Sequence, residues 1–195
     1  MKSKLWGGRF NKKTNPLVED FTKSIQFDKK LAKYDCLGSI AHARMLGKCN
    51  IIPKKDAAKI ISGLNSILNR IKKDSFKIDD SQEDIHTVIQ NALYKKIGKS
   101  AGMLHTARSR NDQVSLDTRM YFKEEIDSIV ALITGLKKSI KKFSQKNMDV
   151  IIPGFTHLQY AQPVLLSHQM LAYCQMLEGI QRGLLTARKG LMFCL

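Results

Sequence analysis

The chain has 195 residues, 43% of them hydrophobic, and it carries a formal net charge of +16. The hydrophobic fraction is large enough for a sizeable core, which excludes a chain that is disordered throughout. The excess positive charge is mostly lysine, spread along the sequence in pairs without a dense basic block or interleaved aromatic residues, so we expect solvated basic faces and no nucleic-acid partner.

No apolar run is long enough to span a membrane, and the N-terminus lacks the apolar segment of a signal peptide. The cysteines lie far apart, and no Cys/His spacing is typical of a zinc site. We therefore expect a cytoplasmic protein with reduced cysteines, no metal and no membrane partner.

Apolar residues recur at helical spacing over about 17–48 and again over 54–73, which predicts helices in both segments. The sequence Ser-Gln-Glu-Asp at 81–84 has the form of a capping box for a further helix that ends near Gly98. His86 lies on that helix, where a structural and a catalytic role both stay open. No segment alternates between apolar and polar residues as a strand does, so the chain is predicted to be almost entirely helical.

Residues 105–113, His-Thr-Ala-Arg-Ser-Arg-Asn-Asp-Gln, form a polar cluster directly before a long apolar-periodic segment. Unpaired backbone N–H groups and the helix dipole favour an anion at such a place. Arg108 and Arg110 add planar guanidinium groups that fit carboxylates bidentately. The alternative is an ordinary helix cap with solvated arginines, and these residues alone leave both interpretations open.

The segment after this cluster has apolar side chains at alternating steps of four and three, which is the heptad pattern of a helix inside a bundle. These side chains are Phe122, Ile126, Ile129, Ile133, Leu136, Ile140 and Phe143. One further helix cannot cover this stripe, so the pattern implies partner chains or further residues of the same chain.

Pro153 and Pro163 enclose a second polar stretch, which contains Thr156 and His157. Because prolines stop helices on both sides, the stretch is predicted to be a rigid loop. Its side chains offer donors, acceptors and a titratable imidazole, although a structural histidine is an equally good interpretation. A last helix is expected from residue 164.

Taken together, these motifs resemble the argininosuccinate lyase family, in its order and spacing over residues 4 to about 178. The resemblance is carried by Trp6-Gly7-Gly8-Arg9-Phe10, Ser24, Gly38-Ser39-Ile40-Ala41-His42-Ala43, Glu83-Asp84-Ile85-His86, residues 104–113 and residues 153–163. The resemblance implies the fumarase/aspartase superfamily, whose members are homotetramers with a central bundle of long helices and active sites built from three subunits. It also implies elimination of fumarate from argininosuccinate, which leaves L-arginine, without a cofactor.

The fold expected from the resemblance is all-α. A small N-terminal helical domain over 1–107 would precede the first long helices of a central bundle of the fumarase/aspartase type over 108–195, the bundle being incomplete. The expected function is that of a carbon–nitrogen lyase in arginine biosynthesis. The alternative is a non-catalytic helical fragment, either a remnant or a co-assembling subunit.

The resemblance also assigns site residues. Ser24, Arg110, Asn111 and Thr156 match substrate-binding positions, and His157 matches the histidine of proton transfer, either as the acid/base itself or as a relay. No metal is implied.

The chain differs from the family's pattern in several places. Ala107 stands where glycine is usual, and alanine does not readily adopt a positive φ. Tyr160 replaces a common arginine. After Glu178 the sequence is expected to leave the pattern, with glycines at 179, 183 and 190 interrupting the helix. Because the Gly-Ser-Ser loop with the serine base and the C-terminal domain have no counterpart here, we expect a truncated or frameshifted copy that is inactive.

Overall fold

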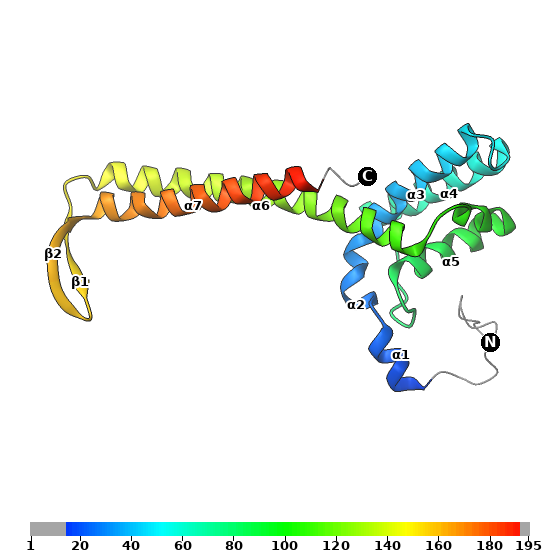
Figure 1. Ribbon diagram of the computed structural model, residues 1–195, viewed down its shortest axis with the longest axis horizontal. Coiled ribbons are helices and arrows are strands. Elements are labelled where there is room, and N and C mark those ends of the chain that lie inside the picture. The colour runs from blue at the N-terminus through cyan, green and yellow to red at the C-terminus, as the bar shows by residue number, and fades with distance from the viewer. Residues whose placement is uncertain (1–14, 192–195) are drawn as a thin grey trace. The chain divides into compact units, whose positions relative to one another are not determined.

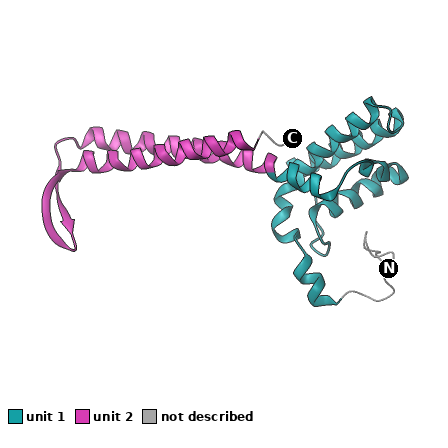
Figure 2. Cartoon of the chain, viewed as in Figure 1, with its two compact units in different colours: residues 1–118 teal, residues 119–195 magenta. Residues whose placement is uncertain are grey.

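The computed structural model describes residues 15–191, and the Trp6–Phe10 motif lies outside this range. The chain divides into two compact units, residues 1–118 and 119–195 (Figure 2). The division falls inside a long helix, and the functional domains expected over 1–107 and 108–195 remain a prediction. The described residues are helical apart from one hairpin and the connecting segments, which confirms the all-α class (Figure 1).

Unit 1 is a group of helices around one apolar core. Its elements are α1 (Pro16–Thr22), α2 (Ile25–Asp28), η1 (Lys29–Leu31), α3 (Ala32–Lys48), α4 (Lys54–Lys72), α5 (Ile85–Ile97), η2 (Gly98–His105) and the first turns of α6 (Arg110–Lys146). The segment predicted to be helical over about 17–48 is thus divided among α1, α2, η1 and α3. The apolar stripes of α3, α4 and α5 face one another and bury large side chains such as Ile60, Leu64 and Leu93 completely.

Unit 2 contains the rest of α6, the strands β1 (Ile151–Thr156) and β2 (Gln159–Leu165), and α7 (Leu166–Gly190). The helices α6 and α7 run antiparallel, as their cross-contacts show. Arg188 Nε lies 2.6 Å from Asp127 Oδ1, and the Gln181 amide donates to Thr134 Oγ1 at 3.1 Å. Lys137 forms an ion pair with Glu178 nearer the hairpin.

The loop predicted between the prolines is wrong, because this stretch forms an antiparallel β-hairpin. Thr156 pairs with Gln159, and the two residues between them have positive φ values, 47° at His157 and 65° at Leu158. Two such residues make the type I′ turn that suits the twist of a hairpin. The sequence does not predict this hairpin, because His-Leu lacks the usual Asn-Gly turn signal and proline normally disfavours strands.

The expected interruption of the last helix is also wrong. Helix α7 is continuous to Gly190 and passes through Gly179 and Gly183. Each glycine in a helix interior costs about 1 kcal/mol relative to alanine. The contacts of Gln181 and Arg188 with α6 lie on either side of Gly183 and stabilise the helical conformation of this segment.

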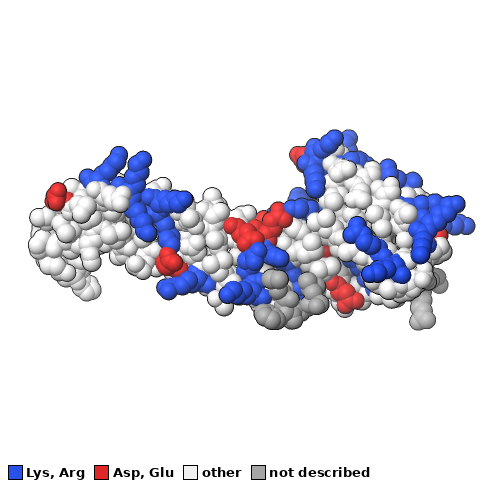
Figure 3. All heavy atoms as spheres, turned by 90° about the horizontal axis from the view of Figure 1, so that it is seen from above, with Lys and Arg blue, Asp and Glu red and all other residues white. Residues whose placement is uncertain are grey.

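The surface of the chain is basic, as expected from its composition. On the face drawn in Figure 3, lysine and arginine side chains form several separate groups, with acidic side chains between some of them. None of the described helices combines the length and apolarity that crossing a membrane requires.

Candidate active site

The polar cluster before α6 folds into a tight turn followed by a helix cap. Arg108 N–H donates to His105 O at 3.2 Å, with Thr106 at φ −59°, ψ 126° and Ala107 at φ 53° between them. These are the angles of a type II turn, which normally requires glycine at the position of Ala107. The substitution noted in the sequence therefore falls at a strained position, and the turn carries Arg108 into the interior.

The first turn of α6 is capped by a reciprocal pair. Ser109 Oγ accepts from the Asn111 N–H at 3.2 Å, and Asp112 Oδ2 accepts from the Ser109 N–H at 3.2 Å. This arrangement resembles a capping box. The capping interpretation thus holds for Ser109 and Asp112, but the arginines are not solvated: the Arg108 side chain is 5% exposed and that of Arg110 is 32% exposed.

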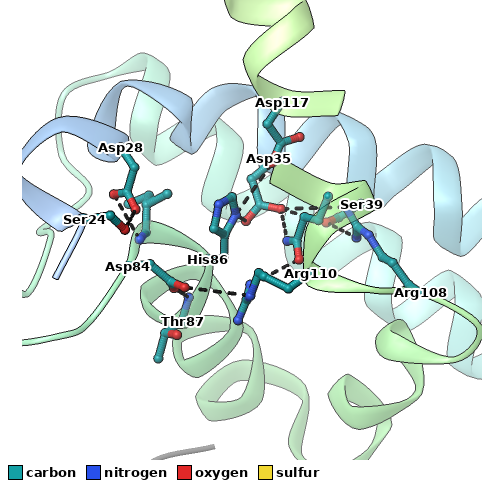
Figure 4. Close-up of polar contacts among 12 residues, drawn as sticks. Ser24, Asp28, Asp35, Ser39, Asp84, His86, Thr87, Arg108, Arg110 and Asp117 are labelled. Atoms are coloured by element: carbon teal, nitrogen blue, oxygen red, sulfur yellow. Dashed lines mark hydrogen bonds and ion pairs between the residues drawn. The ribbon is translucent and has the colours of Figure 1, made fainter. Parts of the chain in front are cut away.

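Arg110 connects the starts of two helices. Its Nε lies 3.7 Å from Asp84 Oδ2, and its Nη1 donates to Gln113 Oε1 at 3.1 Å (Figure 4). Asp84 is the N-cap of α5 and accepts from the Thr87 N–H at 2.6 Å. The capping box expected at 81–84 is therefore wrong, because its last residue is itself the cap and Ser81 bonds to Asp79 instead.

Ser24 lies at the same end of α5. Its N–H donates to Glu83 O at 2.9 Å, and its hydroxyl donates to Asp28 Oδ2 at 2.5 Å. The other oxygen of Asp28 accepts from the N–H of Ile85, the first residue of α5, at 3.2 Å. The structure thus brings Ser24, the residue before α2, and Arg110, the first residue of α6, to the start of α5, as Figure 4 shows.

Asn111, next to Arg110, is exposed. An open hollow of about 1190 Å³ extends over this side of unit 1, and Asp84, Thr87 and Arg110 are among its lining residues. The start of α6 therefore presents a guanidinium group to open space, beside an exposed amide in the same helical turn.

Thr156 and His157 lie elsewhere. Both are exposed on the hairpin of unit 2, where Thr156 ends β1 and His157 is the first turn residue. Tyr160, which stands where arginine is common in the family, has its ring 5.0 Å from that of Phe155. The 37 residues of α6, about 55 Å of helix at 1.5 Å per residue, separate the hairpin from Asn111 along the chain. The structure does not bring these two sets of candidate residues together in one unit.

A buried cluster behind the start of α6 escaped the sequence analysis. His86 Nδ1 lies 3.4 Å from Asp35 Oδ2 and 3.6 Å from Asp117 Oδ2. The side chains of these three residues are at most 2% exposed. The Gln113 amide and the Ser39 hydroxyl both donate to Asp35 Oδ1. The sequence analysis singled out His86 but not its partners, and a further signal was the polar pair Gln113 and Asp117, spaced by one helical turn.

Burial sets the protonation of this cluster. Burial, reinforced by the charge of Asp35, raises the pKa of Asp117 to about 7. Burial alone would lower the pKa of His86, but the adjacent Asp35 carboxylate, 3.4 Å away, and the other nearby negative charges raise it above its usual value. Such a cluster holds protons in the neutral range.

The three residues also have the donor types of a metal site, and their donor atoms lie within 4.8 Å of one another. However, Arg108 Nη2 lies 4.0 Å from Asp35 Oδ1, and Gln113 donates to the same oxygen. Asp35 Oδ1 is therefore already engaged by donors of this chain.

Comparison with known proteins agrees with the resemblance. The sequence profile of a lyase family matches residues 8–193. The chain is 50% identical over 187 residues to the argininosuccinate lyase of Pelotomaculum thermopropionicum. This alignment covers 96% of this chain and 41% of that protein. It is 53% identical over 173 residues to the argininosuccinate lyase of Geobacter metallireducens, and this alignment covers 89% of this chain and 38% of that protein.

Solved structures support the fold. An EDDS lyase in complex with formate superposes with a TM-score of 0.71 at 21% identity, covering 90% of this chain and 34% of that one. A fumarate lyase:delta crystallin from Brucella melitensis superposes with a TM-score of 0.71 at 19% identity, and the superposition covers 89% of this chain and 45% of that one. These neighbours confirm the all-α fold of the fumarase/aspartase type. The chain therefore belongs to the lyase family, and it spans 38–41% of the length of its two argininosuccinate lyase relatives named above.

Proposed function

We propose that this chain supplies the N-terminal part of an argininosuccinate lyase, which eliminates fumarate from argininosuccinate and leaves L-arginine in arginine biosynthesis. The observation that carries the proposal is the start of α6, where Arg110 and Asn111 share one helical turn beside an open hollow. The succinyl part of the substrate is a dicarboxylate. Guanidinium, amide and helix N-terminal N–H groups are the donors that carboxylates prefer.

In this proposal, Arg110 and Asn111 bind a carboxylate, and the hydroxyl groups of Ser24 and Thr156 complete the donor set. Removal of a carbon-bound proton next to a carboxylate makes a dianionic aci-carboxylate, which fixed donors stabilise most effectively. His157 moves a proton in this step or in protonation of the leaving guanidine, directly or as a relay. Its exposed position at a hairpin tip suits a residue that enters the site of another subunit.

A homotetramer is the second part of the proposal. Four seam side chains of α6 are 42–50% exposed: Phe122, Ile129, Leu136 and Phe143. Apolar stripes of this kind mark interaction surfaces. Since α6 alone is about 55 Å long, a site that uses both Asn111 and His157 combines the start of one subunit's helix with the end of another's. We propose a cytoplasmic enzyme with a small-molecule substrate, no cofactor, and neither nucleic acid nor a membrane as partner.

We further propose that these 195 residues by themselves do not turn over the substrate, because the resemblance places the serine base on a segment without counterpart among them. The competing proposal is a non-catalytic helical fragment that only co-assembles with longer subunits.

A chimera tests the proposal. Residues 8–178 of this chain would replace the matching N-terminal part of the Geobacter metallireducens relative, and fumarate formation from argininosuccinate would be followed by absorbance. We expect turnover, and we expect Asn111→Ala to reduce it by about 100-fold or more. The exposed Asn65 on α4 provides the matched control, since Asn65→Ala should leave the rate unchanged. A folded, tetrameric chimera without turnover would favour the non-catalytic fragment.

A further inference from the structure

The first turns of α6 are anchored by two polar side chains that lie one helical turn apart. Gln113 donates to Asp35 on α3, and Asp117 faces His86 on α5, with Oδ2 3.6 Å from Nδ1 (Figure 4). Gln113 also accepts a hydrogen bond from Arg110. The Gln113 side chain thus connects the buried Asp35 to Arg110, the arginine proposed to bind a carboxylate.

Asp117 is an unusual anchor because its carboxylate is completely buried and poorly paired. Within the described residues, neither of its oxygens accepts a hydrogen bond, and His86 Nδ1 also lacks one. Buried carboxylates in this condition are costly unless a proton or a cation compensates them. The charged and titratable groups around Asp117 are Asp35 and Cys36 on α3, Asp84 and His86 on α5, Arg108 before α6, and Arg110 on α6.

The charges of the innermost groups show what is missing. Asp35 and Asp117 are two negative charges, and the buried Arg108 offsets one of them, so one more positive charge is needed for neutrality. A proton bound by this pair, on Asp117 or on His86, supplies it. The raised pKa values of both residues agree with this assignment.

Helices α3 and α6 approach closely beside Asp117. A Cβ built on Gly38 of α3 would lie 2.9 Å from Leu116 Cδ2 and 3.3 Å from Asp117 Oδ1. Any larger residue at position 38 would have to displace the Leu116 side chain, so glycine favours the close approach of α3 and α6 beside the buried Asp117 carboxylate.

We infer that Asp117 is a positioning residue: a proton bound by the adjacent Asp117 and His86 neutralises the buried cluster, which holds the first turns of α6 against α3 and α5 and thereby places Arg110 and Asn111 for the carboxylates of the substrate. The last step of this inference rests on the proposed function, whereas the proton and the anchoring do not.

The pH dependence follows from the sign of the shifts. A raised pKa means that the closed cluster binds its proton more tightly than an opened one does, so opening becomes easier as the pH rises. For one proton, the equilibrium constant of opening increases by up to about tenfold per pH unit until the closed cluster has lost it. For Asp117, whose pKa is raised from 3.8 to about 7, the increase should extend from about pH 4 to pH 7 and level off above it.

Nuclear magnetic resonance on the 195-residue chain tests the proton directly. The carboxyl ¹³C resonance of Asp117 and the ring ¹⁵N resonances of His86 should titrate together in a step near or above pH 7. Titration of Asp117 below pH 5, with His86 unaffected by that step, would overturn the inference. This measurement needs no variant and no enzymatic activity.

Hydrogen exchange tests the anchoring. After correction for intrinsic exchange, the amides of residues 113–117 should lose protection between about pH 4 and pH 7 in the unmodified chain. Asp117→Asn should remove this pH dependence, whereas Asp80→Asn, which changes an exposed carboxyl group in the same unit, should keep it. An unchanged profile in a folded Asp117→Asn chain would exclude a role for Asp117 in holding α6.

The chimera described above tests the link to the substrate. Its KM for argininosuccinate should rise with pH more steeply than that of the Asp117→Asn chimera, with kcat changing less than KM. If exchange behaves as expected but KM shows no such difference, the positioning role is wrong. If no chimera turns over argininosuccinate, the proposed function fails while the proton and exchange results still stand.

Discussion

The two units of the chain bury their side chains in very different ways. In unit 1, large apolar side chains of α3, α4 and α5 form a closed core, and even charged groups such as Asp35 and His86 are sealed inside. Over residues 119–191, the buried apolar residues are Ile126 and Cys174, while many larger apolar side chains stay exposed. Unit 1 contains its own stabilising core, whereas unit 2 requires further surface to cover its helices.

The largest expected effect tests whether the two units act together across subunits. In separate chimeras, His157→Asn should lower turnover by about 10²–10⁴-fold, as for loss of an acid or base, and Asn111→Ala should also inactivate. When the two are mixed under subunit exchange, some sites receive neither substitution, so activity should partly return. If mass spectrometry verifies the hybrids and activity still does not return, then the site lies within one subunit or the residues are misassigned.

Core truncation should separate the units by stability. Leu64→Ala in unit 1 removes a completely buried side chain and should lower the free energy of unfolding by about 2–5 kcal/mol, measured by urea denaturation. Leu132→Ala in unit 2 removes a side chain that is 73% exposed and should change it by less than about 0.5 kcal/mol. Equal losses at the two sites would contradict the comparison.

Self-association should depend on unit 2 and on salt. The exposed α6 seam favours association, and the net charge of +16 opposes it through repulsion that salt screens. The weight-average mass from light scattering should therefore rise from low to physiological salt. Leu136→Lys should weaken this rise, because it places a charge on the seam. A monodisperse monomer at both salt concentrations would show that the seam needs no cover.

The smallest expected effect concerns the turn before α6. Ala107→Gly should stabilise the chain by about 1 kcal/mol or less, because glycine adopts the observed φ of 53° without steric cost but is more flexible when unfolded. Thermal unfolding of the two chains measures the difference. Destabilisation by more than about 1 kcal/mol would mean that the Ala107 methyl group makes a packing contribution larger than its backbone strain.

The helices were predictable because local periodicity determines them. The stripe from Phe122 to Phe143 identified α6, and the polar cluster at 105–113 identified its start. The hairpin was not predictable, because its turn residues have no turn propensity and its register depends on pairing across the turn. The continuity of α7 depends on contacts with α6 that residue propensities do not contain.

The candidate site was predictable in part for the same reason. Arg110 and Asn111 stand in a local motif, and their position at the start of α6 follows from it. The cluster of Asp35, His86 and Asp117 joins three helices that are distant in the sequence, so no local pattern reveals it. Ser24 reaches the start of α5 through Asp28 and Glu83, again by tertiary contact.

The hairpin turn places two selective pressures in opposition. His157 and Leu158 both adopt left-handed backbone conformations that asparagine and glycine occupy more easily, and Leu158 is 93% exposed. A directed-evolution library screened for thermal resistance alone should therefore enrich Asn-Gly at these positions, and each enriched clone would have lost the imidazole of the proposed proton transfer. A library screened for turnover should retain the histidine and confine its improvements to position 158.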